Sequence, residues 1–537
     1  MRRLFIIPFL AALLASALSA QWAGGAQAPC ESLATLALGN AKITLAQLVP
    51  AGTFTLPQSP PNRTPPGFKG VPTFCRVVAD AAPTPDSDIK IEVWMPATGW
   101  NGKFKGQGNG GFAGVIDYPG MAAAVKRGYA TAGTDTGHTT TDAAWALGHP
   151  QKVIDFGYRG IHEMTIKARA IIDAFYGSNP QHSYFASCSD GGREALMEAQ
   201  RFPDDYDGIL AGAPANYWTH LLVGAMWDVQ ATTLDPASYI PASKIPALGV
   251  AVLAACDAQD GLRDGILNDP RQCHFNPETL LCKDANSDAC LTAPQVAALK
   301  KIYAGPHDSA GRRIFPGYLP GGETGPGGWL LWITGNDPGR SLISFFGKGF
   351  FTNMVYEKSD WDYKTFSVDQ GARLADTKTG DALNAVNPNL RPFMKRGGKL
   401  ILYHGWSDAA IPATNTIDYY NSVVAKMGQH ETGSFVRLFM APGMQHCGGG
   451  PGPNSFGQWG GDAKSDSGHN IYLALEQWVE KGVAPSSIIA TKYMDDGNPA
   501  RGVKMTRPLC PYPQIAKYKG SGDVNDAANF VCVAGRR

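Results

Sequence analysis

Ser183-Tyr-Phe-Ala-Ser-Cys-Ser-Asp-Gly-Gly-Arg193 gives the clearest indication of the fold. Residues 184–186 form a short apolar run typical of a strand, and a turn of small residues follows around Ser189. Residues 193–201 are rich in Glu, Ala, Leu and Met and predict a helix. Another apolar run, 208–212, comes next. The stretch therefore predicts a strand, a tight turn, a helix and a second strand, with Ser189 at the turn.

Strands and helices are also expected on both sides of this stretch. Residues 89–96 alternate like a strand, and residues 158–176 carry apolar side chains at helical spacing. Residues 399–404 and 435–439 are apolar runs typical of buried strands, and 470–483 forms an amphipathic helical pattern. Strands that alternate with helices predict an α/β fold with a mostly parallel sheet covered on both faces.

Residues 217–390 differ from the rest of the chain. They are rich in Cys, Asp, Gly, Pro and aromatic residues and show little strand alternation. We predict a lid inserted after the middle of the sheet, and a catalytic domain formed by 21–216 and 391–537.

Residues 1–20 have the pattern of a secretory signal peptide. Arg2 and Arg3 precede an apolar run, 4–14, and small residues suited to cleavage follow. An uncleaved anchor is the alternative. No other stretch is expected to span a bilayer, so no membrane partner is expected after signal removal. The formal net charge of +1 gives no indication of a nucleic-acid partner.

The chain contains ten cysteines, an even count that predicts five disulfides in an exported protein. Secretion or a periplasmic location is therefore expected. Short spacings predict local bridges at Cys256–Cys273, Cys282–Cys290 and Cys510–Cys532. The other cysteines are Cys30, Cys75, Cys188 and Cys447.

Two of these cysteines adjoin residues typical of nucleophilic catalysis, in Cys188-Ser189 and His446-Cys447. A bond between Cys188 and Cys447 would place a hydroxyl next to an imidazole that can take its proton. With Asp408 as the acid, the order Ser189, Asp408, His446 is that of α/β-hydrolases. Asp408 would orient the imidazole, and the nearby His404 is expected to line the pocket.

An oxyanion formed by attack of Ser189 needs preorganised donors. The backbone N–H of Asp190 is one candidate, and a glycine-rich loop, 106–114, supplies the others at Gly110 and Gly111. Residues 106–111 also match Gly-x-Gly-x-x-Gly, but the residues after them begin a helix poorly, which disfavours a dinucleotide site. Ile161-His-Glu-Met-Thr165 lacks the second histidine of a zinc-peptidase helix.

An acidic loop, Cys256-Asp-Ala-Gln-Asp-Gly-Leu-Arg-Asp-Gly-Ile266, predicts a structural Ca²⁺ site. Hard oxygen ligands at this density suit calcium, although the spacing is not that of an EF-hand. A solvated acidic turn is the alternative. The expected ligands are the carboxylates of Asp257, Asp260 and Asp264 and the carbonyls of Leu262 and Ile266.

Together these motifs resemble the tannase and feruloyl esterase family of α/β-hydrolases, from Cys30 to Cys532. The resemblance implies the pairs Cys30–Cys75 and Cys188–Cys447 besides the three local bridges. It also implies a calcium site in the acidic lid loop and an oxyanion loop at 109–114. Ser187 departs from the family pattern, which usually has Gly at this position. The family cleaves esters of aromatic acids, including galloyl, hydroxycinnamoyl and mono(2-hydroxyethyl) terephthalate esters.

We therefore expect a secreted or periplasmic serine esterase that forms an acyl-Ser189 intermediate with a small aromatic ester. The alternatives are a terephthalate monoester hydrolase, a serine peptidase and a non-catalytic binding protein on the same scaffold. A terephthalate monoester would favour a lid cation, for which Arg340 and Lys348 are available. The lid aromatics at 327–332, 345–346 and 350–351 are candidates to stack on an aromatic acid, with core packing as the alternative.

Overall fold

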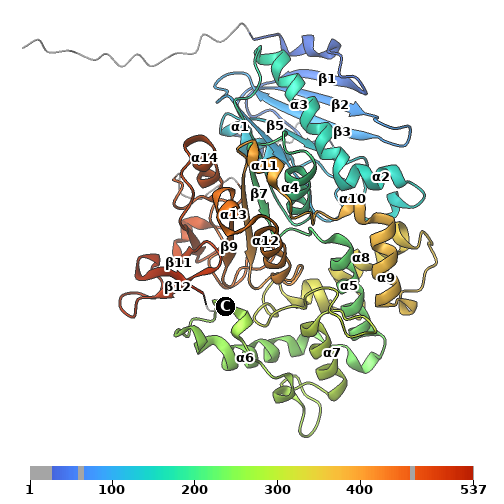
Figure 1. The fold of residues 1–537 in the computed structure, drawn as a ribbon, viewed down its shortest axis with the longest axis vertical. Coiled ribbons are helices and arrows are strands. Elements are labelled where there is room, and N and C mark those ends of the chain that lie inside the picture. Colours follow the sequence, from blue (N-terminus) through green and yellow to red (C-terminus); the bar gives the residue numbers. More distant parts are fainter. Residues whose placement is uncertain (1–26, 58–65, 460–465, 536–537) are drawn as a thin grey trace, which may run out of the picture.

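The computed structural model describes residues 27–57, 66–459 and 466–535 (Figure 1). Within these residues the largest sheet has nine strands in the order β1-β2-β3-β5-β4-β6-β7-β8-β9. The strands are β1 (Ala41–Val49), β2 (Phe74–Ala81), β3 (Ile89–Pro96), β4 (Lys103–Gln107), β5 (Ala130–Thr134), β6 (His182–Cys188), β7 (Gly208–Gly212), β8 (Lys399–Gly405) and β9 (Val436–Ala441). The predicted signal peptide, 1–20, lies outside the described residues.

The sheet has an antiparallel part and a parallel part. Strands β1, β2, β3 and β5 pair antiparallel, and the pairs from β5 through β4, β6, β7 and β8 to β9 are all parallel. The interior strand β7 is buried along its whole length, as expected for a parallel strand that has helices on both faces.

Helices cover both faces of the sheet. Helices α3 (Gly160–Tyr176), α4 (Asp190–Arg201) and α12 (Thr414–Met427) share one apolar core with Val93, Phe185 and Leu402. Helices α1 (Tyr118–Lys126) and α14 (Ile471–Lys481) share another core with Leu210 and Ile401. Because Ile401 and Leu402 are neighbours on β8, the two cores lie on opposite faces of the sheet. The expected α/β-hydrolase class is therefore confirmed.

The predicted elements agree with the structure to within a few residues. The helix expected at 158–176 is α3, which continues a shorter helix, α2 (Pro150–Ile154), through a wider turn at Asp155–Arg159. Sequence patterns did not predict β1, β2, β4 or β5, nor the helices α1, α12 and α13 (Gln429–Phe435). They also missed two small sheets near the C-terminus, β10 (Ile488–Tyr493) with β11 (Val503–Leu509) and β12 (Gln514–Tyr518) with β13 (Phe530–Ala534).

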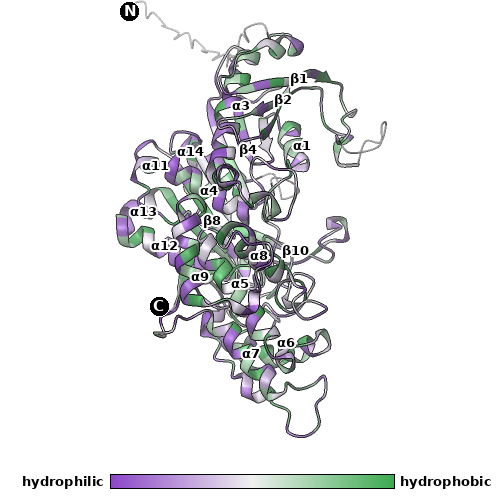
Figure 2. Ribbon diagram, turned by 90° about the vertical axis from the view of Figure 1, so that its right-hand side faces the viewer, coloured by the Kyte–Doolittle hydropathy of each residue, from purple (hydrophilic) through white to green (hydrophobic). Residues whose placement is uncertain are grey.

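The chain between β7 and β8 contributes no strand to the nine-stranded sheet in the described structure. Its helices are α5 (Trp218–Thr233), α6 (Ile245–Cys256), α7 (Ala293–Ala304), α8 (Leu342–Phe350), α9 (Val368–Ala375), α10 (Asp381–Leu383) and α11 (Arg391–Lys395). Both views place α6 and α7 at the end of the molecule opposite β1 (Figures 1 and 2). Most of these helices share one apolar core, which includes Trp329, Phe350 and Phe351 and continues to Phe112 and Phe156 outside this part of the chain. We propose 217–390 as the lid.

One segment differs from the expected hydropathy. Pro236–Asp260 has the length and mean hydropathy, 1.5, of a membrane span. The expectation that no stretch beyond the N-terminus is long and apolar enough to span a bilayer is therefore wrong. The segment is not one continuous α-helix, because α6 covers only Ile245–Cys256 and short 3₁₀ turns flank it. At 1.5 Å per residue α6 is about 18 Å long. Its side chains Leu248 and Val252 are fully buried in the core of the proposed lid.

All ten cysteines lie in the described part of the chain, and none is free. The pairs are those that the family resemblance implies: Cys30–Cys75, Cys188–Cys447, Cys256–Cys273, Cys282–Cys290 and Cys510–Cys532. Four of these bridges span between 8 and 45 residues. Cys188–Cys447 spans 259 residues and ties the end of β6 to the loop after β9.

Candidate active site

Ser189 occupies the sharp turn between β6 and α4. Its backbone has φ 69° and ψ −123°, a conformation that residues with a side chain rarely adopt. Its N–H donates to the carbonyl of Gly212 at 2.9 Å, which ties the turn to β7. A strained strand-to-helix turn of this kind presents the serine hydroxyl above the sheet.

Ser187 fits at this turn because two neighbouring glycines leave room for it. A side chain at Gly191 would collide with the Ser187 hydroxyl, and a Cβ at Gly108 would lie 2.7 Å from the Ser187 Cβ. The departure at Ser187 therefore leaves the geometry of the turn intact.

Ser189, His446 and Asp408 form a continuous chain of hydrogen bonds. His446 Nε2 lies 2.9 Å from Ser189 Oγ, and His446 Nδ1 lies 2.8 Å from Asp408 Oδ2. The three residues come from the ends of β6, β9 and β8, respectively. Because parallel strands end at one edge of the sheet, residues far apart in sequence meet there. An imidazole placed in this way can remove the serine proton.

Asp408 is fixed from several directions. Its Oδ1 accepts hydrogen bonds from the backbone N–H groups of Ala410 (2.8 Å) and Ile411 (2.9 Å). Burial would raise the pKa of this carboxyl, but His446 and His404 together hold its pKa well below the usual range. Asp408 therefore stays ionised and can stabilise a protonated His446.

His404 does not have the position expected from the sequence. Its side chain is fully buried, with Nε2 3.1 Å from Asp408 Oδ2 and Nδ1 2.7 Å from Thr416 Oγ1. The expectation that it lines the pocket is wrong, because β8 directs it behind Asp408. Its spacing of four residues from Asp408 was the only signal in the sequence that pointed to this contact.

The bridge Cys188–Cys447 joins the residues that adjoin Ser189 and His446, with a Cα–Cα distance of 6.0 Å. We expect the double variant Cys188→Ala/Cys447→Ala to lose kcat before it loses its fold, because a misplacement of about 1 Å in an active site can cost ~10²-fold. The measurement is kcat together with Tm.

Cys282→Ala/Cys290→Ala is the matched control for that variant, since this bridge closes a short loop just before α7, away from the triad. Unchanged turnover in the Cys188/Cys447 variant would show that the bridge has no positioning role.

The glycine-rich loop after β4 reaches the same edge of the sheet. Asp190 and Gly111 line one cavity with Ser189 and His446, while Gly110 lies between Asn109 and Gly111 in the same loop. Asp190 is the first residue of α4, so its N–H has no acceptor within the helix. The structure thus brings the predicted oxyanion donors of Asp190 and Gly111 to the nucleophile.

A cavity of about 80 Å³ opens beside Ser189, and most of its walls are apolar. The proposed lid contributes the largest side chains. Trp332 meets the His446 ring edge-on, with ring centroids 5.0 Å apart. The lid residues that line the cavity are Trp218, Leu221, Leu222, Ala225, Tyr318, Trp332, Ile343 and Phe346.

The lid aromatics expected to meet a substrate divide into three groups. Trp332 and Phe346 line the cavity, whereas Phe350 and Phe351 are fully buried in the core. Phe345 is 45% exposed and lines a larger hollow of about 930 Å³ on the outer side of α8. Arg340 and Lys348 line that outer hollow and not the cavity at Ser189.

A family model described as tannase and feruloyl esterase matches residues 75–533. The chain belongs to the tannase and feruloyl esterase family. Members of this family are carboxylic ester hydrolases, and the chain is one of them. This assignment agrees with the triad geometry at the edge of the sheet.

Three relatives show how closely this family member matches known proteins. It is 42% identical to an uncharacterized esterase of Xanthomonas campestris, over 95% of this chain and 92% of the relative. It is 35% identical to the mono(2-hydroxyethyl) terephthalate hydrolase of Piscinibacter sakaiensis, over 83% and 82%. The crystal structure of feruloyl esterase B from Aspergillus oryzae superposes with a TM-score of 0.85 at 31% identity, covering 94% of this chain and 99% of that structure.

The acidic loop of this esterase has the donor chemistry that calcium requires. Burial, together with the neighbouring Asp264 and Asp257, raises the pKa of Asp260 to about 6, so the three carboxylates repel one another. Gly261 (φ 92°) and Gly265 (φ 78°) allow the loop to turn. Asp264 Oδ2 already pairs with Arg507 at 2.6 Å. The oxygens of these three carboxylates do not all lie within 4.8 Å of one another in the described structure, so a cation there would have to draw them together and share Asp264 with Arg507.

The carbonyls of Leu262 and Ile266, expected as further ligands, belong to the same loop. Ile266 donates its N–H to Asp264 Oδ1 and is buried, whereas Leu262 donates its N–H to Asp260 Oδ1.

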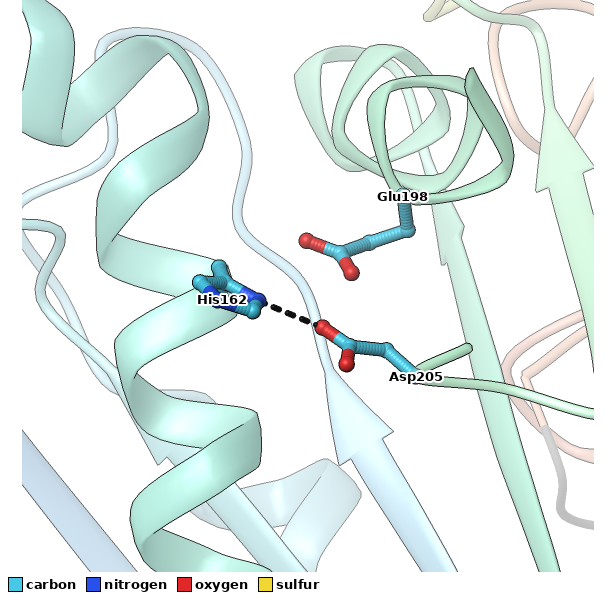
Figure 3. Close-up of side chains that lie close together, drawn as sticks. All are labelled: His162, Glu198 and Asp205. Atoms are coloured by element: carbon cyan, nitrogen blue, oxygen red, sulfur yellow. Dashed lines mark hydrogen bonds and ion pairs between the residues drawn. The ribbon is translucent and has the colours of Figure 1, made fainter. Parts of the chain in front are cut away.

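Another group of titratable residues lies between α3 and α4, away from the cavity (Figure 3). His162 Nδ1 contacts Asp205 Oδ2 at 2.7 Å, and the buried Glu198 directs its carboxyl toward the same point. Burial and the adjacent Asp205 raise the pKa of Glu198 well above its usual range. Glu198 Oε1 and Oε2 have no hydrogen-bond partner in the described structure, and a neutral Glu198 carboxyl avoids charge repulsion with Asp205.

Proposed function

We propose that this protein is a serine esterase that cleaves esters of aromatic carboxylic acids through an acyl-Ser189 intermediate. The observation that carries the proposal is the hydrogen-bonded chain Ser189–His446–Asp408. Ser189 and His446 line a cavity whose walls include aromatic side chains. Trp218, Trp332 and Phe346 offer faces and edges to an aromatic ring.

The chemistry follows from this geometry. His446 Nε2 takes the Ser189 proton as Oγ attacks the ester carbonyl, and the N–H groups of Asp190 and Gly111 stabilise the resulting oxyanion. The C–O bond to the alcohol then breaks, and His446 returns the proton to the leaving alcohol. Water, activated by His446, hydrolyses the acyl-serine and regenerates the hydroxyl.

The size of the cavity favours a small acyl group. Its volume of about 80 Å³ is well below the ~300 Å³ at the lower end of typical ligand pockets. The aromatic acid is then the part that enters, and the alcohol points outward. Because Arg340 and Lys348 line the outer hollow, the cavity does not place a cation against a free terephthalate carboxylate.

The direct test compares methyl ferulate, methyl gallate and mono(2-hydroxyethyl) terephthalate, with Ser189→Ala as the blank. We expect turnover of at least one of the first two, and none in the variant. An amide of the preferred acid tests the peptidase alternative, and labelling of Ser189 by a fluorophosphonate tests the binding-protein alternative. If none of the three esters is cleaved and the probe does not label Ser189, the proposal is wrong.

We also propose an extracellular or periplasmic location. Five disulfides in one chain require an oxidising compartment to form and persist. The predicted signal peptide supplies a route to such a compartment.

We further propose that the acidic loop binds Ca²⁺ and that the ion is structural. We expect EGTA to lower Tm, because a ligand that binds only the folded state contributes about 2.7 kcal/mol when its free concentration is 100 times its Kd. Differential scanning calorimetry with and without added CaCl₂ checks this.

Asp257→Asn/Asp260→Asn, which removes two of the expected ligands, should be insensitive to EGTA. An equal Tm of the wild-type protein with and without calcium would contradict the site.

A further inference from the structure

Glu194 is a buried carboxyl that the triad does not use. It lies one turn into α4, five residues after Ser189, and is 1% exposed. Its Oε2 accepts a hydrogen bond from the backbone N–H of Asn109 at 2.8 Å. Its Oε1 has no hydrogen-bond partner within the described structure. Burying a carboxyl that makes only one hydrogen bond costs free energy of folding. A role for that one bond, to Asn109, would account for the presence of Glu194 here.

That partner, Asn109, holds the oxyanion loop to the rest of the sheet edge. Its side-chain amide donates to the carbonyls of Val115 (2.7 Å) and Thr134 (2.9 Å). Its own carbonyl accepts from the N–H of Gly191 at 3.0 Å. Asn109 therefore joins the loop to β5 and to the first turn of α4, and Gly111 follows two residues later.

The packing at this point is close enough to transmit a displacement. A Cβ added at Gly108 would lie 2.6 Å from Glu194 Oε2, so the carboxyl touches the loop backbone itself. If Glu194 were shortened, the Asn109 N–H would lose its acceptor, and a cavity would form beneath the loop.

We propose that Glu194 is a positioning residue for ester hydrolysis: its buried carboxyl holds the Asn109 backbone and thereby fixes the oxyanion loop beside Ser189. This inference rests on the proposed esterase function. Glu194 acts through Asn109 and Gly111 and does not touch the substrate.

The charges around Glu194 indicate whether its carboxyl is neutral or ionised when it holds the Asn109 backbone. Burial and the neighbouring Asp190 raise its pKa to about 8, while Arg193 and the Asn109 N–H oppose that shift. Asp190, Arg193 and Glu198 are its charged or titratable neighbours on α4, and the uncharged Ser187 and Asn109 lie nearby on β6 and in the loop. The carboxyl is therefore mostly neutral at pH 7. Above pH 8 it would ionise and place a negative charge near the developing oxyanion.

The experiment compares Glu194→Gln with Glu194→Ala. Gln keeps an oxygen for Asn109 and cannot ionise, so we expect kcat within about threefold of the wild type at pH 7 and loss of the activity decline above pH 8. For Ala we expect kcat to fall by ~10²-fold, the effect of losing one oxyanion donor, with KM changed less than about threefold. Glu198→Gln is the matched control for kcat at pH 7, because Glu198 is equally buried on α4 but its carboxyl faces His162 and Asp205.

Two results would overturn this role. One is an Ala variant with native Tm and wild-type kcat; the other is a Gln variant as impaired as Ala. If Ala fails to fold, the Gln variant decides: an alkaline decline identical to that of the wild type contradicts the inference. Ser189→Ala separates the two proposals. If its turnover persists, the esterase mechanism is wrong, whereas a failure confined to the Glu194 variants leaves that mechanism standing.

Discussion

Replacing Ser189 by alanine is expected to lower kcat for an aromatic ester by about 10⁶, the scale seen when the nucleophile of another serine hydrolase is removed. The Ser189 hydroxyl is 2.9 Å from His446 Nε2 and borders the cavity, so no acyl intermediate can form without it. The fold should survive, since the change removes one hydroxyl whose hydrogen bond in the described structure is to His446 alone. The measurement is kcat by release of the aromatic acid, with Tm measured in parallel.

Ser187→Ala is the matched control for this experiment. Ser187 precedes the same turn and contacts Gly108 and Gly191, but it is not part of the hydrogen-bonded chain to Asp408. Its loss should leave kcat within about tenfold of the wild type, as expected for a residue that only fills space. Equal activity of Ser189→Ala and the wild type would remove the proposed nucleophile.

Replacing Asp408 by asparagine is expected to lower kcat by about 10⁴, as the same change does in a well-studied serine protease. Asp408 Oδ1 accepts from the N–H groups of Ala410 and Ile411, so the oxygen of asparagine would take that position. Its NH₂ would then face His446 Nδ1 and force the imidazole into the wrong tautomer. The effect should appear in kcat with little change in KM.

Asp418→Asn is the control for that measurement, because Asp418 on α12 is half exposed and pairs with Arg313 away from the cavity. It should retain wild-type kcat. A wild-type kcat for Asp408→Asn would mean that another group orients His446, and His404 would then be the first to test.

The triad residues illustrate what local sequence reveals. Ser189 follows an apolar strand and begins a helix, and His446 and Asp408 each follow an apolar run. Such positions can be predicted because strand periodicity and turn composition are properties of the chain itself. The cysteines beside Ser189 and His446 also indicated that these two residues, far apart in sequence, lie close together in the fold.

His404 and the lid aromatics illustrate what local sequence does not reveal. His404 belongs to the same strand end as Asp408, but its direction depends on the packing of α12 beneath it. Phe346 lines the cavity and Phe350, four residues later on α8, is fully buried. Glu194 likewise lies in a predicted helix where nothing in the sequence separates it from other charged residues. Only the approach of loop 108–111 in the folded chain gives its carboxyl a hydrogen-bond donor, the Asn109 N–H.

Sequence patterns alone were enough to predict the order of strands and helices around Ser189, the chain order Ser189, Asp408, His446, and the family to which the chain belongs. These depend on neighbouring residues and on side-chain chemistry, which the chain carries before it folds. Only the folded chain shows which side chains of the proposed lid line the cavity, that His404 contacts Asp408, and that Glu194 accepts a hydrogen bond from Asn109. Each of these contacts joins segments distant in sequence, and close packing between layers selects them.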